Sequence, residues 1–154
     1  MNILELPVLG SRHNQTEKIF TLLSNQPLRN FEGFDLGVLD LDKDLQVYFY
    51  FLNQESENFH YLWDLIIPHA IGCLLVFNWQ DAQSIELNLR TIEYIEGRFS
   101  TPLHICSLPT NSDIPDDLIK EELEMNGKRR LYTLNPESKE SVKQILLQVL
   151  GVKA

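Results

Sequence analysis

The stretch ILELPVLG at residues 3–10 decides the fold of this chain. Residues 3–9 are mostly apolar over the length of one strand, which predicts a buried β-strand. Gly10 follows directly, and a helical pattern begins at about His13. A strand, a glycine turn and a helix in this order form the frame of a phosphate-binding loop. The N-terminal segment therefore predicts a fold of the nucleotide-binding kind.

The loop itself departs from the phosphate-binding pattern G-x-x-x-x-G-K-[ST]. In this register Gln15 stands at the second glycine, Thr16 at the lysine and Glu17 at the residue whose hydroxyl holds Mg²⁺. The lysine that neutralises phosphate charge is therefore missing. We interpret the loop as a vestigial pocket with no bound cofactor. Its residues are Gly10, Ser11, Arg12, His13, Asn14, Gln15, Thr16 and Glu17.

Composition indicates one soluble domain spanning residues 1–154. The apolar fraction is 44%, and no apolar run reaches the 18 or more residues that a membrane helix needs. No basic segment precedes an apolar stretch at the N-terminus, so we expect no signal peptide. The two cysteines make no disulfide framework, which favours the reducing cytoplasm. The net charge of −9 argues against nucleic acid and anionic membranes as partners.

Strand and helix patterns alternate along the chain, with a loop expected at 26–32 and a hairpin turn at 42–44. Pro68 ends the second helix, and Gly151 is the natural stop of the last one. The predicted strands cover residues 3–9, 34–41, 45–52, 71–77, 103–108 and 130–134. The predicted helices cover residues 13–24, 59–67, 82–96, 116–124 and 137–150.

This alternation predicts an α/β fold of three layers, a mostly parallel six-stranded sheet with about five helices on its two faces. The one hairpin, formed by the second and third strands, places a single antiparallel strand at an edge of the sheet. The order of elements is similar to the Ras-like GTPase topology. A doubly wound receiver or flavodoxin fold is the second choice, because it lacks this hairpin.

Four segments resemble the Ras-like small GTPases, and most of all the bacterial group of MglA-type GTPases. GFDLG at 33–37 resembles that group's M-D-F-G segment, and GCLLVFN at 72–78 resembles the G-x-x-x-V-x-D strand. FLNQESENF at 51–59, followed by YLWD at 61–64, resembles the switch II segment F-G-T-P-G-Q-E-R-F and its Trp-containing helix. ESKESV at 137–142 resembles the start of the last helix.

Almost every residue that serves nucleotide chemistry in this superfamily is replaced here. The interval 25–34 holds no switch I Ser or Thr, and Glu55 and Ser56 stand where switch II has its glycine and glutamine. CSLPT at 106–110 stands where a guanine-reading N-K-x-D would fall. Since a charge-assisted hydrogen bond contributes roughly 1.5–3 kcal/mol, these losses together cost at least ~5 kcal/mol of binding, on the order of a thousandfold in affinity. We therefore expect no GTP hydrolysis and no tight, Mg²⁺-dependent GTP binding.

The resemblance implies a bacterial regulatory or scaffold subunit, a non-catalytic pseudo-GTPase that works through its surface in a polarity, motility or signalling complex. Partners of the Roadblock/LC7 type would grip the switch II helix and the edge hairpin, and pairing of edge strands can also give a homodimer. We expect no catalytic residue and no metal site. For the aromatic residues of the helix, packing in the core is the first reading, and an exposed partner surface is the second. The partner-binding candidates are Phe59, Tyr61, Trp63, Asn53 and Glu55.

Two other functions stay open. The first is an atypical nucleotide-binding protein or GTPase, with GTP or GDP and Mg²⁺, that recruits Arg12 or a partner's cation in place of the missing lysine. The second is a degenerate receiver-like signalling domain. That domain needs an acidic cluster at the strand ends, where this chain has Asn53 and Asn78.

Overall fold

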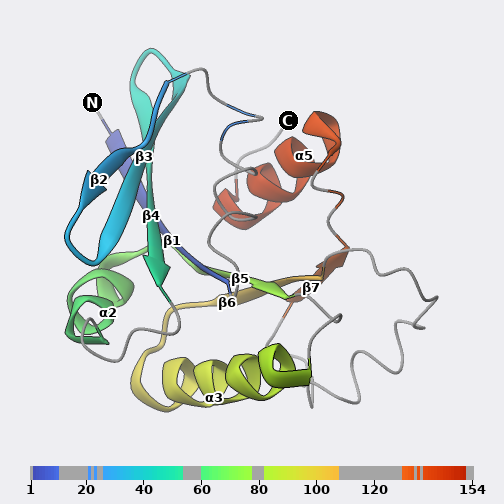
Figure 1. Ribbon diagram of the computed structural model, residues 1–154. Coiled ribbons are helices and arrows are strands. Elements are labelled where there is room, and N and C mark those ends of the chain that lie inside the picture. The colour runs from blue at the N-terminus through green and yellow to red at the C-terminus, as the bar shows by residue number, and fades with distance from the viewer. Residues whose placement is uncertain are drawn as a thin grey trace.

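The computed structural model describes residues 2–10, 21, 23, 26–53, 60–77, 82–107, 130–133, 135 and 137–151. These residues form three layers, with one sheet between two layers of helices (Figure 1). Helix α5 (Lys139–Leu150) covers one face of the sheet. Helices α2 (His60–Ile66) and α3 (Ala82–Arg98) cover the other face, together with the short 3-10 helix η2 (Ile67–His69).

The sheet has seven strands in the order β2-β3-β4-β1-β5-β6-β7. Strand β1 lies at its centre and pairs in parallel with β4 and β5, as a sheet with helical crossovers requires. Strand β3 runs antiparallel to both of its neighbours, β2 and β4. The strands are β1 (Asn2–Gly10), β2 (Arg29–Phe31), β3 (Phe34–Asp42), β4 (Leu45–Asn53), β5 (Cys73–Phe77), β6 (Leu103–Ser107) and β7 (Arg130–Thr133).

The predicted number of six strands was wrong, because residues 29–31 of the predicted loop form β2. The antiparallel strand β3 is consequently second from the edge, and β2 is the edge strand. Gly33, at φ 92°, makes the turn between Phe31 and Phe34, a backbone conformation that glycine adopts without strain. The rings of Phe31 and Phe34 stack with centroids 5.1 Å apart, which fixes the short strand on β3.

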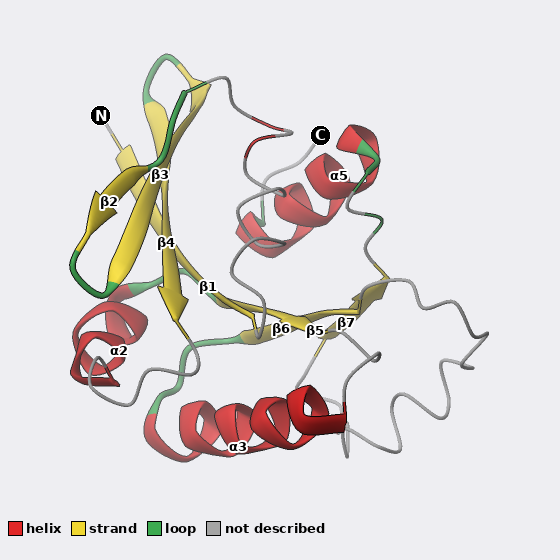
Figure 2. Cartoon of the chain, viewed as in Figure 1, coloured by secondary structure: helices red, strands yellow, loops and turns green. Residues whose placement is uncertain are grey.

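The helices follow their sequence signals where they are described (Figure 2). Helix α5 begins after Ser138, whose side chain accepts a hydrogen bond from the Ser141 N–H, and it ends at Gly151, which has φ 69°. Pro68 lies in the first turn of η2, just beyond the end of α2. Thr21 and Leu23 are helical, in agreement with the predicted helix at 13–24. The rest of that helix and the predicted helix at 116–124 lie outside the described residues.

Alternation along the strands divides the core into two clusters, one on each face of the sheet. On β1, Leu6 and Val8 face α5, whereas Leu9 faces α2 and α3. The carboxyl ends of the parallel strands β1, β4, β5, β6 and β7 all lie at one edge of the layers, because each runs in the same direction. Ligands of such sheets bind at this edge, so the fold places the predicted pocket there.

Candidate functional site

The first residue of the predicted phosphate pocket, Gly10, lies at the end of the central strand. Gly10 is the last residue of β1, it is buried, and it is in register with Asn53 of β4 and Val76 of β5. The other seven residues of the predicted pocket, 11–17, lie outside the described residues. The register that places Thr16 at the lysine position therefore stays a prediction from the sequence.

Among the predicted partner-binding residues, the structure describes the side chains of Trp63 and Tyr61, and these two point to opposite sides of α2. Trp63 is only 2% exposed and packs in the core with Leu9 and Ile67, so its assignment to a partner surface was wrong. Tyr61, two residues earlier on α2, is 57% exposed. A shift of two residues turns a helical side chain by about 200°, which explains why the two aromatic residues point in opposite directions. Glu55 and Phe59 lie outside the described residues, and Asn53 is described only as the end of β4.

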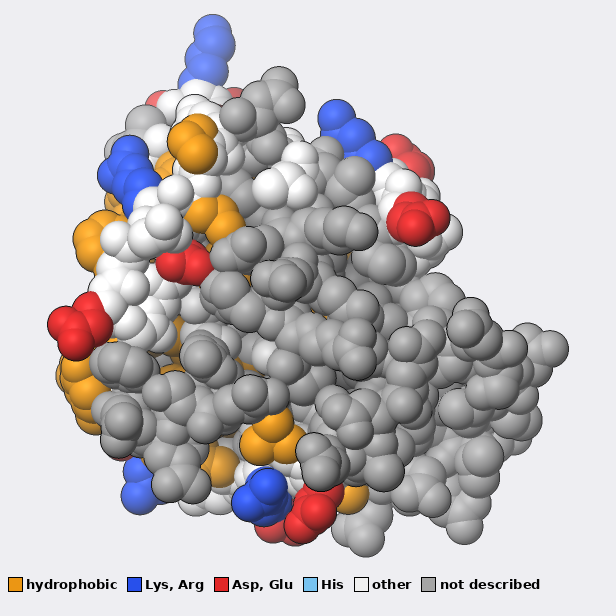
Figure 3. Space-filling view, in the orientation of Figure 1, with side chains coloured by type: hydrophobic (Ala, Val, Ile, Leu, Met, Phe, Trp, Pro, Cys, Tyr) orange, Lys and Arg blue, Asp and Glu red, His pale blue; other side chains and the backbone are white. Residues whose placement is uncertain are grey.

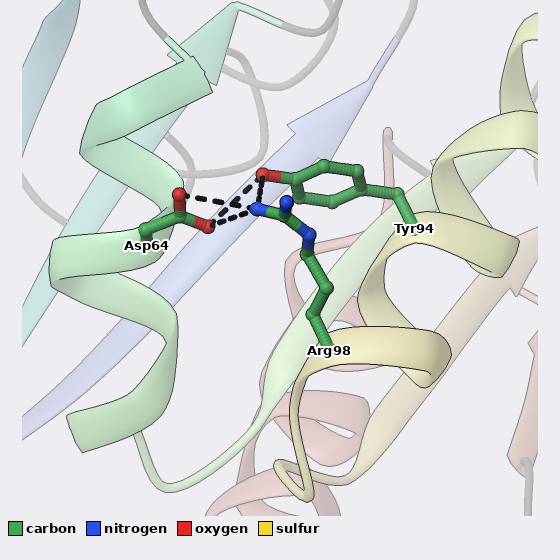
Figure 4. A network of polar contacts seen from close by, with 3 residues as sticks. All are labelled: Asp64, Tyr94 and Arg98. Atoms are coloured by element: carbon green, nitrogen blue, oxygen red, sulfur yellow. Dashed lines mark hydrogen bonds and ion pairs between the residues drawn. The ribbon is translucent and has the colours of Figure 1, made fainter.

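Helix α2 is joined to α3 by a network of three exposed or half-buried side chains (Figure 4). The Tyr94 hydroxyl donates to Asp64 Oδ1 at 2.9 Å, and Arg98 Nη1 donates to both Asp64 oxygens at 3.2 and 3.3 Å. The Arg98 guanidinium also lies over the Tyr94 ring, 4.7 Å from its centroid. Burial, and then the hydrogen bond to Asp64, raise the pKa of Tyr94. Beneath this network Trp63 meets Tyr94 edge to face, so α2 is held from its core side as well.

The outward surface of α2 is apolar. Leu65 is 64% exposed and follows Tyr61 by four residues, a spacing that places both side chains on one side of the helix. The sequence signal for Leu65 was its four-residue spacing from Tyr61. Together Tyr61 and Leu65 form an exposed apolar ridge on α2.

A second exposed apolar surface lies on strands β1 to β4, on the same side of the sheet as α2. Ile3 of β1 is 47% exposed and Phe31 of β2 is 51% exposed. Figures 1 and 3 show β2 and β3 extending beyond α2, with hydrophobic side chains along the left edge of the molecule, over β2 and α2. We call this surface the open face. Its apolar residues are Ile3, Phe31, Leu36, Val38 and Tyr48.

Strand register shows that these residues share one side of the sheet. Val38 lies directly opposite Tyr48, and Phe34 lies opposite Leu52, which belongs to the core under α2. Leu36, Val38 and Tyr48 are partly buried, but neither core cluster includes them. Within the described part of the chain, the open face is thus a part of the sheet that no helix covers.

The Glu5 carboxylate lies among the apolar residues of the open face. Glu5 of β1 accepts a hydrogen bond from the Tyr50 hydroxyl of β4 at 3.1 Å. Burial and the neighbouring Glu5 charge raise the pKa of Tyr50 to about 12. Tyr50 therefore stays neutral at physiological pH and keeps its proton directed at Glu5.

The described residues contain no group of three or more His, Cys, Asp or Glu that could hold a metal ion. Burial raises the pKa of Cys73 and of Cys106 to about 12, so neither thiol is a nucleophile at neutral pH. His104 is placed as a core histidine. Its Nδ1 lies 3.2 Å from the Tyr132 hydroxyl oxygen, and the other side of its ring packs against the backbone of Gly72. No helix within the described ranges is long and apolar enough to cross a membrane.

Comparison with solved structures identifies the architecture. The chain is similar to the Arl6 (BBS3) small GTPase from Trypanosoma brucei, solved with the bound nucleotide analogue GppNp, with a TM-score of 0.73. The match covers 97% of this chain and 96% of that protein, at 10% sequence identity. This is a small-GTPase-like fold. No protein-family model matches the sequence, and no curated protein matches it either.

The small-GTPase-like fold decides between the two topologies that the sequence left open, and the receiver-like alternative is thereby excluded as the architecture. At 10% identity the likeness extends to the fold alone.

Proposed function

We propose that this protein is a pseudo-GTPase, a non-catalytic module with a small-GTPase-like fold that binds a protein partner. One observation carries the proposal. All four large hydrophobic side chains that are exposed in the described part of the chain lie on the same side of the sheet: Ile3, Phe31, Tyr61 and Leu65. Apolar surface gathered on one side marks an interaction site, whereas exposed hydrophobic residues scattered singly need no explanation.

Loss of the nucleotide is supported by the chemistry of the loop that would hold it. In the register set by Gly10, neither Thr16 nor Glu17 can supply the positive charge that a triphosphate requires, and Glu17 adds a negative one. The set of donors therefore does not fit Mg-GTP. Without a γ-phosphate to order the switch segments, α2 would be held by its contacts with α3 and with the sheet, which makes the module constitutive.

The proposed setting is a bacterial regulatory complex of the polarity, motility or signalling type, in the cytoplasm, with a partner of the Roadblock/LC7 kind. The support for this setting is the resemblance of four segments to the MglA-type group. In this proposal the ridge of Tyr61 and Leu65 replaces Trp63 as the contact that α2 offers.

A pull-down from the native host tests the interaction. The double variant Tyr61→Ser/Leu65→Ser removes the apolar ridge without touching the core, and we expect it to lower capture of the main partner at least about tenfold. Arg90→Gln/Glu93→Gln on the exposed side of α3 is the matched control, because it changes two exposed residues and no net charge. Equal capture by both variants would contradict a docking role for α2.

Nucleotide binding is the second candidate function, favoured by the likeness to a protein solved with GppNp. It requires a cation from elsewhere, and Arg12 in the loop is the nearest candidate in sequence. Mg-GTP affinity in the micromolar range that is lost in Arg12→Gln would establish this alternative.

A further inference from the structure

We propose that the open face binds an amphipathic helix of another protein, and that this helix carries lysine or arginine beside its apolar stripe. The inference rests on the proposed function and adds the chemistry of the partner. It concerns the sheet surface of Ile3, Phe31, Leu36, Val38 and Tyr48, and not the ridge on α2.

The layer structure indicates why a helix fits this surface. A sheet strand alternates its side chains between two faces, and each apolar face is normally buried against a helix or a second sheet. On β4, Val47 and Phe49 point to the face covered by α5 and are fully buried. Tyr48, between them, points to the open face and is only partly buried. An added helix would give these strands the second covering layer that the rest of the sheet has.

Addition of a strand is a weaker alternative. Strand β2 is the edge of the sheet on this side, and it has only three residues, Arg29–Phe31. One of its sides is already paired with β3, so few backbone groups remain for another chain. Short edge strands that carry a charged residue such as Arg29 are typical of sheets that resist pairing with other strands.

The charges on and around the open face favour a basic partner. Glu5 lies among the apolar residues of β1 and β4, where a carboxylate attracts a cation more strongly than it would in open water. Asp40 on β3 accepts a hydrogen bond from Gln46 Nε2 at 2.7 Å, toward the hairpin end of the same surface. The hairpin turn itself adds Asp42 and Asp44.

Two cations, Arg29 on β2 and Lys43 in the hairpin turn, oppose these four carboxylates, so the region is negative on balance. The whole chain has the same sign, with a net charge of −9. A membrane surface or a nucleic acid would be repelled by it. A second copy of this chain is also disfavoured, because a twofold interface on the open face would bring two surfaces of the same negative charge together.

Three synthetic peptides test the proposal. Each has 18 residues and the same leucine stripe at helical spacing, and its flanking residues are all Lys, all Gln or all Glu. Fluorescence anisotropy of the labelled peptide gives the affinity for the full-length protein at low and moderate salt. We expect the Lys peptide to bind at least about tenfold more tightly than the Gln peptide, and we expect this advantage to shrink as salt rises. The Glu peptide should bind most weakly.

Protein variants show where the peptide binds. Ile3→Ser removes apolar surface from the open face, and Glu5→Gln removes the charge while keeping an acceptor for the Tyr50 hydroxyl. We expect each to weaken the Lys peptide about threefold to tenfold. Glu93→Gln on α3 is the matched control, because it removes the same charge elsewhere and should leave the affinity unchanged within about twofold. Thermal unfolding of every variant checks that the fold is intact.

Each of the other outcomes would contradict the inference and would show which part of it is wrong. Equal affinity for the three peptides, still lowered by Ile3→Ser, would keep a docking surface but reject a basic partner. Binding that Ile3→Ser does not change, or no binding of the Lys peptide at 1 mM, would reject the open face as its site. A dimer seen by sedimentation and abolished by Ile3→Ser would show that a second copy is the occupant. The proposed function fails separately, through micromolar binding of Mg-GTP.

Discussion

At the scale of single residues, two aromatic side chains of α2 differ in their exposure to solvent and therefore in their role. Trp63 is buried among Leu9, Ile67 and other core residues, whereas Tyr61 points outward. The first holds α2 on the sheet, and the second is free to meet a partner. Residue type alone does not separate these roles, because both residues are large aromatics on the same short helix.

Substitution at the two positions should therefore give opposite results. Trp63→Ala leaves a large cavity in the core and should cost about 3–5 kcal/mol of unfolding free energy. Tyr61→Ala removes a side chain that is 57% exposed and should change the stability by no more than about 0.5 kcal/mol. Urea denaturation followed by circular dichroism measures both values. Similar losses in the two variants would contradict the placement of Trp63 in the core.

The two cysteines give a second test at this scale. Both thiols are buried, and burial raises the pKa of each from 9.0 to about 12. The native protein should therefore fail to react with a disulfide reagent at pH 8, and two thiols should react once urea unfolds the chain. The folded chain also holds these protons more tightly than the unfolded chain, so stability is complete below pH 9 and falls as pH rises from 9 toward 12. Fast reaction of one thiol in the native protein would show that its strand is open to solvent.

At the scale of elements, the position of α2 depends on its contacts with α3 and with the sheet. The Asp64, Tyr94 and Arg98 side chains form the polar part of that contact, and the Trp63 ring forms the apolar part. Thr101 adds a hydrogen bond from its hydroxyl to the carbonyl oxygen of Ile67 in η2, at 2.8 Å. These contacts hold α2 and η2 against α3 and the sheet.

A double-mutant cycle measures the polar contribution. Asp64→Asn and Arg98→Met, alone and together, should give a coupling free energy of about 0.2–1 kcal/mol in urea denaturation, because both side chains are solvent-exposed. The coupling should decrease at high salt. A coupling of zero at low salt would mean that the apolar contact of Trp63 with Tyr94 is what holds α2 on this side.

Sequence reasoning predicted some elements well and others poorly, for physical reasons. The end of α5 was predictable because a glycine directly after an apolar helical pattern is a common helix stop. Strand β5 was predictable because a strand covered on both faces is apolar throughout. Strand β2 was missed because its three residues, Arg29–Phe31, are all exposed and show no burial pattern. It is a strand only because the Gly33 turn folds it onto β3.

The candidate site was less predictable than the fold. The open face is apolar in alternate positions, as any sheet face is, and only the arrangement of the helices shows that this one has no cover. Ile3 and Leu9 have the same type of side chain and face the same side of β1, yet one is exposed and the other is buried. That difference comes from the position of α2 and η2, which no local pattern encodes.

At the scale of the whole molecule, the chain combines a small-GTPase-like fold with exposed apolar residues on one side of the sheet. The fold match covers 97% of the chain. In the register that we predict for the phosphate-binding loop, the sequence lacks the lysine and the hydroxyl that the pattern requires. The exposed apolar residues lie on one side, over β1, β2 and α2. We therefore regard the scaffold as preserved for the surface that it presents.

Isothermal titration calorimetry with GTP, GDP and ATP, each with and without Mg²⁺, tests this central claim most directly. The account predicts no measurable heat of binding and no thermal shift at millimolar nucleotide, because the lysine, the metal ligand and the base-reading acid are missing. A dissociation constant in the micromolar range that requires Mg²⁺ would contradict it.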